Sequence, residues 1–257
     1  MKIIITNDDS VMAMGIRALA NYLSVEHELF VVAPDNERSG VSQSITYRRP
    51  FFAKKFPIGP AVTGWGVNGY PVDCVKIALA ELCPFQPDLV VSGINNGLNV
   101  ARNVAHSGTV AGALAGSAAG IPALALSMEA SENEDDFVRA IEIAWPICEA
   151  MVTDPMAKGK TLNVNVPLAA LNGNPEFHVV PANPNPMGNR FLLGKDPNGR
   201  TYYWQTNEPS PEPMTCLSDV EIVTRGDISI TPLTHDMTLY HELDHWSEQV
   251  KTKMSSQ

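Results

Sequence analysis

The chain has 257 residues, of which 44% are hydrophobic and 18% are charged, and its formal net charge is −10. This length is sufficient for one large α/β domain with its own hydrophobic core. The acidic balance and the lack of a basic stripe exclude a general nucleic-acid-binding protein, although a metal ion or a helix N-terminus can still provide local positive potential for a small phosphorylated ligand.

The first ten residues, MKIIITNDDS, combine a strand with an acidic turn. The β-branched run at residues 3–5 is typical of a strand that is covered on both faces. Residues 7–10 favour turns and helix caps, so the strand should end at about Thr6. Adjacent carboxylates, here Asp8 and Asp9, repel each other unless a cation lies between them or water surrounds them. These residues alone therefore leave two alternatives, a solvated turn and a metal site.

Strand-like and helix-like segments alternate through the first two thirds of the chain. The predicted helices cover residues 12–23, 71–82, 107–120 and 134–152. Further predicted strands cover residues 28–34, 88–95, 123–127 and 160–167. This β-α-β-α order predicts a three-layer, Rossmann-like α/β fold, with a mostly parallel sheet and helices on both of its faces.

The amino-acid composition changes from about residue 168, where Pro, Asn and Gly become frequent. The strand-prone and helix-prone pieces within this part are residues 201–206, 227–233 and 239–250. We expect hairpins and loops that form an arm over an active site or toward a partner subunit. The predicted organisation is an α/β catalytic core over residues 1–180, followed over residues 181–257 by a β-hairpin arm, a returning strand and a C-terminal helix that belong to the same domain and serve oligomerisation.

The cysteines are scattered and form no CxxC pair; they are Cys74, Cys83, Cys148 and Cys216. This pattern fits reduced thiols better than a disulfide framework. The apolar run at the N-terminus is too short for a signal peptide, and no stretch approaches the length of a membrane span. We therefore expect a cytoplasmic protein that binds neither membrane nor nucleic acid.

Ligands bind open parallel sheets beyond the carboxyl ends of the strands. Small oxygen-bearing side chains and glycines crowd the loops after the first three predicted strands, at residues 7–10, 34–44 and 92–109. Asp8 and Asp9 offer anionic oxygens. Ser39, Asn95 or Asn96 could add neutral oxygens. A set made only of oxygens suits Mg²⁺ or Mn²⁺ and suits zinc poorly.

The sequence HSGT, residues 106–109, begins a helix of small residues. The backbone N–H groups of such a turn and the hydroxyls of Ser107 and Thr109 can bind a phosphate. A metal site together with a phosphate cradle indicates phosphoryl chemistry. Taken alone, the same turn is also an ordinary helix cap.

Two other phosphoryl-transfer folds also place aspartates after the first strand, and both fit poorly. A response-regulator receiver needs an aspartate at the end of its third strand, where this chain has Ser92, Gly93 and Ile94. Phosphatases of the haloacid-dehalogenase type use Asp-x-Asp, whereas the aspartates here are adjacent.

The sequence HELDH, residues 241–245, matches the zinc-protease pattern His-Glu-x-x-His. Only twelve residues follow it, which leaves little room for a third ligand, although Glu248 is nearby. The predicted helix is charged and terminal rather than part of a central cleft. A polar face of a C-terminal helix is therefore the preferred interpretation.

Taken together, the loops resemble the SurE family, the "survival protein E" metal-dependent nucleotidases. The resemblance runs nearly end to end. It is carried by ITNDDS, VVAPDNERSGVSQSIT, NGYPVDCVKIAL, PDLVVSGINNGLN, HSGTVAGALAG, LNVNVP, DPNGRTYYW and DISITPL. Few families join an Asn-Asp-Asp turn to a Ser-Gly-Ile-Asn-x-Gly loop.

The resemblance implies one divalent metal per subunit, Mg²⁺ or Mn²⁺, held by Asp8, Asp9, Ser39 and Asn95. The expected phosphate site consists of Asn7, Asn96, Ser107, Gly108 and Thr109. The expected catalytic residues are Asp8, Asp9 and Asn96. The implied reaction is hydrolysis of nucleoside 5′- and 3′-monophosphates to nucleoside and phosphate, with short polyphosphate as a further candidate substrate. The resemblance also implies a homodimer or homotetramer formed through the C-terminal arm.

In this scheme the metal would polarise a phosphoryl oxygen and lower the pKa of a bound water. Asp8 or Asp9 would orient that water, while Asn96 and the Ser107–Thr109 hydroxyls would stabilise charge on the phosphoryl oxygens. His106 and His235 are either donors to the leaving group or ordinary core or surface residues.

The chain departs from the family pattern outside the presumed metal ligands. Ser10 replaces a glycine, His106 replaces a tyrosine, and Ala115 stands where glutamate is frequent. Thr234 follows TPL, and the histidine comes one position later as His235. These departures concern substrate preference and rate, and they leave open the alternative of a nucleotide-binding regulatory protein with little catalytic activity.

Overall fold

The structure, a computed structural model, describes residues 1–59, 62–185, 190–206 and 217–254. The strands of its main sheet are β1 (Lys2–Thr6), β2 (Glu28–Pro34), β3 (Ala53–Pro57), β4 (Thr63–Val67), β5 (Leu89–Asn96), β6 (Ala123–Met128), β7 (Thr161–Val166), β8 (Phe177–Val179) and β11 (Ile228–Leu233). Within the described residues these nine strands pair in the order β3-β4-β2-β1-β5-β6-β7-β11-β8.

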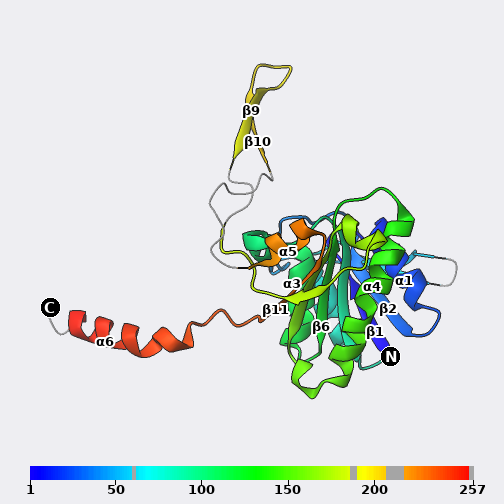
Figure 1. The fold of residues 1–257 in the computed structure, drawn as a ribbon, viewed down its shortest axis with the longest axis horizontal. Coiled ribbons are helices and arrows are strands. Elements are labelled where there is room, and N and C mark those ends of the chain that lie inside the picture. Colours follow the sequence, from blue (N-terminus) through cyan, green and yellow to red (C-terminus); the bar gives the residue numbers. More distant parts are fainter. Residues whose placement is uncertain (60–61, 186–189, 207–216, 255–257) are drawn as a thin grey trace.

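Helices pack on both faces of this sheet (Figure 1). Where the structure describes the chain, the α-helices are α1 (Met14–Leu23), α2 (Pro71–Ile77), α3 (Gly108–Ala118), α4 (Glu134–Thr153), α5 (Asp219–Arg225) and α6 (Leu243–Met254). A π-helical turn extends α2, and a 3-10 turn at Ala101–His106 precedes α3. The predicted three-layer, mostly parallel α/β fold is confirmed.

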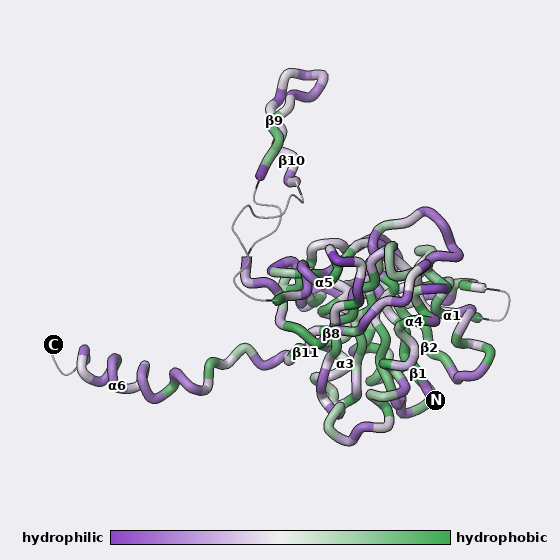
Figure 2. Tube along the Cα trace, in the orientation of Figure 1, coloured by the Kyte–Doolittle hydropathy of each residue, from purple (hydrophilic) through white to green (hydrophobic). Residues whose placement is uncertain are grey.

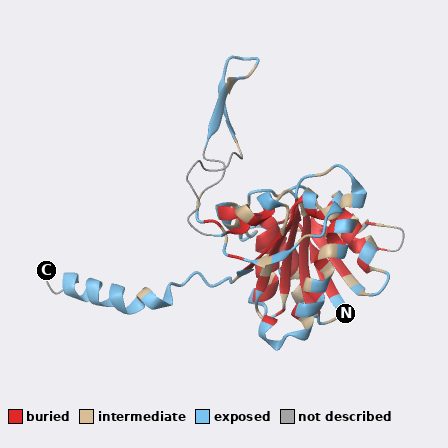
Figure 3. Cartoon of the chain, viewed as in Figure 1, coloured by how far each residue is buried: buried red, intermediate tan, exposed pale blue. Residues whose placement is uncertain are grey.

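The three isoleucines of β1 show how one strand serves two hydrophobic layers. Side chains alternate between the faces of a strand. Ile3 and Ile5 therefore pack in the layer that contains α1 and α4, while Ile4 packs in the layer that contains α2 and α3. All three are fully buried, as a central strand of a parallel sheet requires. In Figure 3 the buried residues accordingly gather in the sheet and along the inner sides of the helices.

Four elements of the body lie in segments for which the sequence analysis predicted none: β3, β4, β8 and α5. The first two form an antiparallel pair at one end of the sheet. Their sequences, AKKFP and TGWGV, contain lysines and glycines, which are depleted in strands. The last predicted strand is confirmed as β11, which pairs antiparallel with β7.

The predicted hairpin is present as β9 (Phe191–Lys195) and β10 (Thr201–Gln205), which form a separate two-stranded sheet. This hairpin and α6 project away from the α/β body (Figure 1). Figure 2 shows an apolar stretch along β9. Among its exposed side chains are Leu193 (68% exposed) and Trp204 (69% exposed), so the projecting parts offer apolar surface that the body does not cover.

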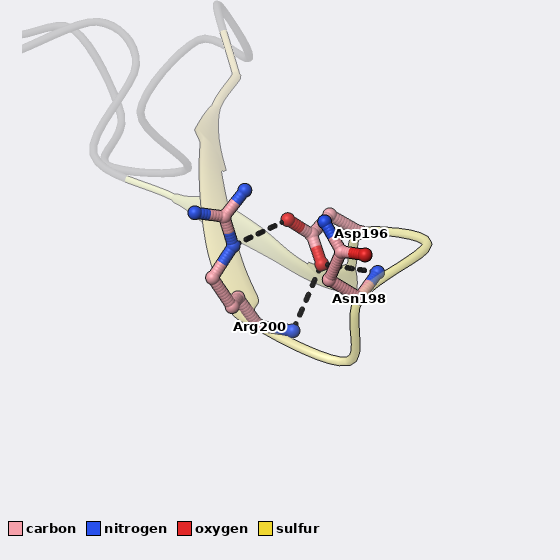
Figure 4. Close-up of polar contacts among 3 residues, drawn as sticks. All are labelled: Asp196, Asn198 and Arg200. Atoms are coloured by element: carbon pink, nitrogen blue, oxygen red, sulfur yellow. Dashed lines mark hydrogen bonds and ion pairs between the residues drawn. The ribbon is translucent and has the colours of Figure 1, made fainter.

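The tip of the hairpin is held by one carboxylate (Figure 4). Asp196 accepts backbone N–H bonds from Asn198 and Arg200 at 2.9 Å, and the Arg200 guanidinium donates to Asp196 at 2.7 Å. These bonds, those from Arg200 foremost, hold the pKa of Asp196 below its usual value. The sequence DPNGR therefore closes as a well-defined turn.

In the described part of the chain, every helix is either too short or too polar to cross a membrane.

Candidate active site

Three loops that are far apart in the sequence meet at Asp8, beyond the carboxyl end of β1. The Asp8 side chain is 4% exposed. Its Oδ1 accepts a hydrogen bond from the hydroxyl of Thr109, in the first turn of α3. The backbone carbonyl of Asp8 accepts the N–H of Arg38, from the loop after β2, at 2.6 Å. The loops after β1 and β2 and the start of α3 are thus joined at one residue, Asp8, through its backbone carbonyl and its carboxylate.

The start of α3 approaches this turn so closely that only glycine fits at position 108. A Cβ atom on Gly108 would lie 2.7 Å from Cβ of Asp8 and 3.1 Å from the carbonyl oxygen of Arg38. Glycine is the residue that allows such a close approach of backbone to a neighbouring group. The backbone of the first turn of α3 therefore lies directly against the acidic turn.

The end of β5 places Asn95 and Asn96 next to the acidic turn. Gly93 has φ +148°, and a Cβ there would lie 2.3 Å from the carbonyl oxygen of Leu126 in β6. The register between β5 and β6 shifts between Ser92 and Asn95. After this irregularity, the backbone N–H of Asn96 donates to Oδ2 of Asp9 at 3.3 Å. Asp9 is thereby tied to the loop that carries the predicted metal ligand Asn95 and the predicted phosphate-site residue Asn96.

Burial raises the pKa of both carboxylates, and the charge of Asp8 raises that of Asp9 further. Burial raises the pKa of Asp8, and hydrogen bonds, led by the one from Thr109, oppose this rise. The pKa of Asp9 is raised to about 6 by burial and then by the charges of Asp8 and Glu37. Among the described residues, no Lys, Arg or His side chain forms an ion pair with either aspartate. A bound cation would offset the repulsion between the two carboxylates and lower both pKa values.

The residues around the pair fit a hard divalent cation. In the described residues no three His, Cys, Asp or Glu side chains converge on one point, so any site must combine the two carboxylates with neutral oxygens. Oγ of Ser39 donates to Glu37 at 2.8 Å, and its lone pairs can still serve as a ligand. The amide nitrogen of Asn95 donates to the Gly97 carbonyl at 2.7 Å, which leaves Oδ1 as its ligand atom. A set of oxygens with two negative charges suits Mg²⁺ or Mn²⁺.

The N-terminus of α3 provides backbone N–H donors beside the carboxylates. Ser107 is the N-cap residue, and its Oγ accepts the N–H of Val110 at 3.1 Å. The predicted cap is thus confirmed. The N–H groups of the first turn and the positive end of the helix dipole favour a bound anion. Phosphate binding at Ser107, Gly108 and Thr109 stays a prediction that this arrangement supports.

Comparison with known proteins agrees with the motifs. The family model described as "Survival protein SurE" matches residues 3–184. The chain belongs to the SurE family. The protein named 5′-nucleotidase SurE from Rhodopirellula baltica is 41% identical over 251 residues, which cover 96% of this chain and 99% of that protein. The one from Syntrophomonas wolfei is 37% identical, covering 96% of this chain and 93% of that protein. The crystal structure of the SurE protein from Aquifex aeolicus superposes with a TM-score of 0.78 at 31% identity, covering 95% of this chain and 98% of that chain.

One departure from the SurE pattern has a structural effect at the acidic turn. Ser10, which replaces a glycine, has φ +110°, a conformation that favours glycine. Its carbonyl accepts a hydrogen bond from Nδ2 of Asn7 at 2.9 Å. The turn therefore keeps the conformation that a glycine would adopt, at the expense of backbone strain.

Two predicted site residues of the SurE pattern make structural contacts here. Asn7 is fully buried and uses its side chain to hold the turn. The side chain of Asn96 exchanges two hydrogen bonds with the backbone of Ser131, at 3.1 and 2.9 Å. Asn96 can contact a phosphate through its side chain only if it gives up this pair. The roles of both residues in phosphate binding and catalysis stay predictions.

The histidines considered in the sequence analysis lie at the surface. His106 is exposed at the end of a 3-10 turn, beside Ser107, and His235 is exposed after β11. His241 and His245 belong to the projecting C-terminal segment, where Glu242 accepts the indole N–H of Trp246 at 3.0 Å. This arrangement agrees with the preferred interpretation of HELDH as a polar helix face.

Sequence reasoning missed two residues that shape this SurE site. Glu37 accepts from Ser39 and raises the pKa of Asp9. Ser131 fixes Asn96. The signal for Glu37 was its position two residues before a predicted ligand, whereas nothing in the sequence near Ser131 indicated its contact.

Proposed function

We propose that this SurE family member is a divalent-metal-dependent phosphomonoesterase that hydrolyses nucleoside 5′-monophosphates to nucleoside and phosphate. Nucleoside 3′-monophosphates and short polyphosphate are proposed as further substrates. The observation that carries this proposal is the pair of buried Asp8 and half-buried Asp9, without a cationic partner among the described residues, against the N-terminus of α3. The name 5′-nucleotidase SurE of relatives that align over nearly the whole chain supports it.

We assign the metal site to Asp8, Asp9, Ser39 and Asn95, with one Mg²⁺ or Mn²⁺ per subunit. A bound divalent ion supplies Lewis-acid polarisation of a phosphoryl oxygen and a lower pKa for a coordinated water. The N–H groups of the first turn of α3, with the Ser107 hydroxyl, bind and orient the phosphate. Asn96 stabilises negative charge on it after its side chain leaves the backbone of Ser131. Thr109 acts as a positioning residue, because its hydroxyl is directed to Asp8.

The test is phosphate release from a panel of nucleoside 5′- and 3′-monophosphates and tripolyphosphate, with Mn²⁺, with Mg²⁺ and with EDTA. We expect release that depends on the metal and is abolished in Asp8→Asn. Asp135→Asn, an exposed change in the first turn of α4, is the matched control. Normal turnover by Asp8→Asn, or turnover in EDTA, contradicts the scheme. Nucleotide binding without phosphate release favours the regulatory alternative.

We also propose a homodimer or homotetramer in which the segment 181–257 makes the contacts between subunits. The exposed apolar side chains of β9, β10 and α6, such as Leu193, Trp204 and Trp246, support this assignment. Static light scattering of the intact chain tests it, and a monomer at micromolar concentration contradicts it. A cytoplasmic location is a further proposal, which the free thiols of Cys74, Cys83 and Cys148 support.

A further inference from the structure

A cavity of about 390 Å³ lies on the β3–β4 side of the proposed active site. Its lining residues are Asp35, Phe52, Lys54, Phe56, Gly66 and Asn68. They come from the residue after β2, from β3 with the residue before it, and from β4 with the residue after it. The volume lies within the range of small-molecule sites, roughly 300–1,000 Å³.

The floor of this cavity adjoins the acidic turn. Val11, two residues after Asp9, donates its backbone N–H to the carbonyl of Pro34 at 2.8 Å. Its Cγ1 lies 3.3 Å from the position that a Cβ on Gly66 would occupy. The segment that carries the two aspartates therefore continues into Val11, which packs beneath the cavity against Gly66.

The loop after β2 makes a second connection between the cavity and the carboxylates. Arg38 donates its backbone N–H to the carbonyl of Asp8 at 2.6 Å. Its Nε donates to the carbonyl of Gly69, next to the lining residue Asn68, at 3.2 Å. Asp35 is only four residues from the proposed ligand Ser39, a span of at most about 14 Å. A nucleotide whose phosphate lies at the start of α3 can thus extend its sugar and base in this direction.

Two phenyl rings provide an apolar surface in the cavity. Phe52 is 62% exposed although its side chain is large and apolar. Phe56 lies over Gly66, where a Cβ would be only 2.5 Å from its ring. Exposed aromatic rings of this kind are the usual platforms on which nucleobases stack. A purine, with two fused rings, covers more of such a surface than a pyrimidine does.

The polar groups at the rim match the edge of a base. Oδ1 of Asn68 accepts the backbone N–H of Phe52 at 2.6 Å, so its Nδ2 is the group that can donate to a ligand. The carboxylate of Asp35 can accept a hydrogen bond, and the ammonium of Lys54 can donate one. Purine edges present N–H donors beside ring-nitrogen or carbonyl acceptors. Stacking surface and mixed donors and acceptors therefore occur together in one cavity.

We propose that this cavity is the subsite for the nucleobase of the substrate, that it prefers purines, and that Phe52 determines this preference. The proposal rests on the proposed nucleotidase function and extends it to the base. Phe52 touches neither carboxylate nor the phosphate turn in this assignment, so its contribution is to substrate affinity and selectivity rather than to the chemical step.

The experiment compares Phe52→Ala with Phe177→Ala in the intact chain. Phe177 is also exposed (49%), but it lies on β8, at the opposite end of the sheet. Binding of adenosine and cytidine is measured by calorimetry without any turnover. KM and kcat are measured for AMP and for ribose 5-phosphate, which has the same phosphate ester but no base.

We expect Phe52→Ala to weaken adenosine binding about tenfold or more, as loss of one stacking ring does. KM for AMP should rise by a similar factor, with kcat and the hydrolysis of ribose 5-phosphate unchanged. Phe177→Ala should alter neither measurement. Wild-type protein should bind adenosine more tightly than cytidine.

Unchanged adenosine affinity in Phe52→Ala, or equal losses with AMP and ribose 5-phosphate, overturns the assignment. Equal affinity of the wild type for adenosine and cytidine overturns the purine preference. Failure to release phosphate from either ester with any metal refutes the proposed function instead, and adenosine binding that still depends on Phe52 would then support the base subsite on its own.

Discussion

The Thr109 hydroxyl donates a hydrogen bond to Oδ1 of Asp8, and both side chains are buried. This single contact joins the first turn of α3 to the end of β1. It also opposes the rise in the pKa of Asp8 that burial causes. Thr109, a residue of the predicted phosphate site, thus also positions the predicted metal ligand Asp8 and lowers its pKa.

Thr109→Val should test this relationship, because valine keeps the shape of threonine and removes the donor. We expect a loss of about 1–2 kcal/mol in the free energy of unfolding, since a buried carboxylate loses a hydrogen bond. The affinity for Mn²⁺ should fall at the same time, because the pKa of Asp8 rises further and protons compete with the metal. Urea unfolding and calorimetric metal titration measure the two effects. Thr109→Ser, which keeps the hydroxyl, should retain both the stability and the metal affinity of the wild type. A valine variant with unchanged metal affinity would contradict the role given to the hydroxyl.

The raised pKa of Asp9 should make the metal-free protein less stable as the pH rises. The folded-state pKa is about 6 and the usual value is 3.8. The folded state therefore binds this proton more tightly than the unfolded state, so stability is lost between about pH 4 and pH 6. In EDTA, Asp9→Asn should be more stable than the wild type at pH 7.5 by about 1–3 kcal/mol, with a smaller difference at pH 4.5. Urea unfolding at both pH values measures this difference, and a gain that is the same at both would show that the carboxylate charge is not its cause.

Ser10 should be a site at which glycine stabilises the chain. A non-glycine residue at φ +110° is strained, and such strain costs on the order of 1 kcal/mol. We expect Ser10→Gly to raise the free energy of unfolding by about 0.5–1 kcal/mol, because the relief of strain exceeds the added flexibility of the unfolded chain. Ser10→Ala, which keeps the Cβ atom, is the control and should give no gain. An equal effect of both changes would place the cause in the serine hydroxyl.

Gly108→Ala should damage stability and metal binding together. Its Cβ would lie 2.8 Å from Oδ2 of Asp8, so either the helix or the carboxylate must move. We expect a loss of about 1–3 kcal/mol in the free energy of unfolding, as overpacking usually causes, and weaker binding of Mn²⁺. Gly173→Ala is the matched control, because the added Cβ there would meet only an ordinary contact of 3.4 Å. A Gly108→Ala protein that binds Mn²⁺ normally would argue against the tight approach of α3.

The sequence allowed the central sheet and the position of the site to be predicted for physical reasons. Buried parallel strands have near-continuous hydrophobic runs, and β1, β2 and β5 contain them. Parallel strands end at one edge of the sheet, so their following loops had to meet. The pair β3–β4 escaped prediction because its lysines and glycines weaken the strand signal. The contacts of Asn96 with Ser131 depend on how two loops pack, which no local pattern encodes.

The two ends of the main sheet differ in how they discourage polymerisation. An unpaired strand edge is a template for another chain, and lysine, proline and shortness are the usual safeguards. β3 carries Lys54, Lys55 and Pro57, while β8 has only three residues. We expect the body to resist amyloid-like growth through either end, so that association of these chains proceeds through side-chain surfaces rather than by extension of the sheet.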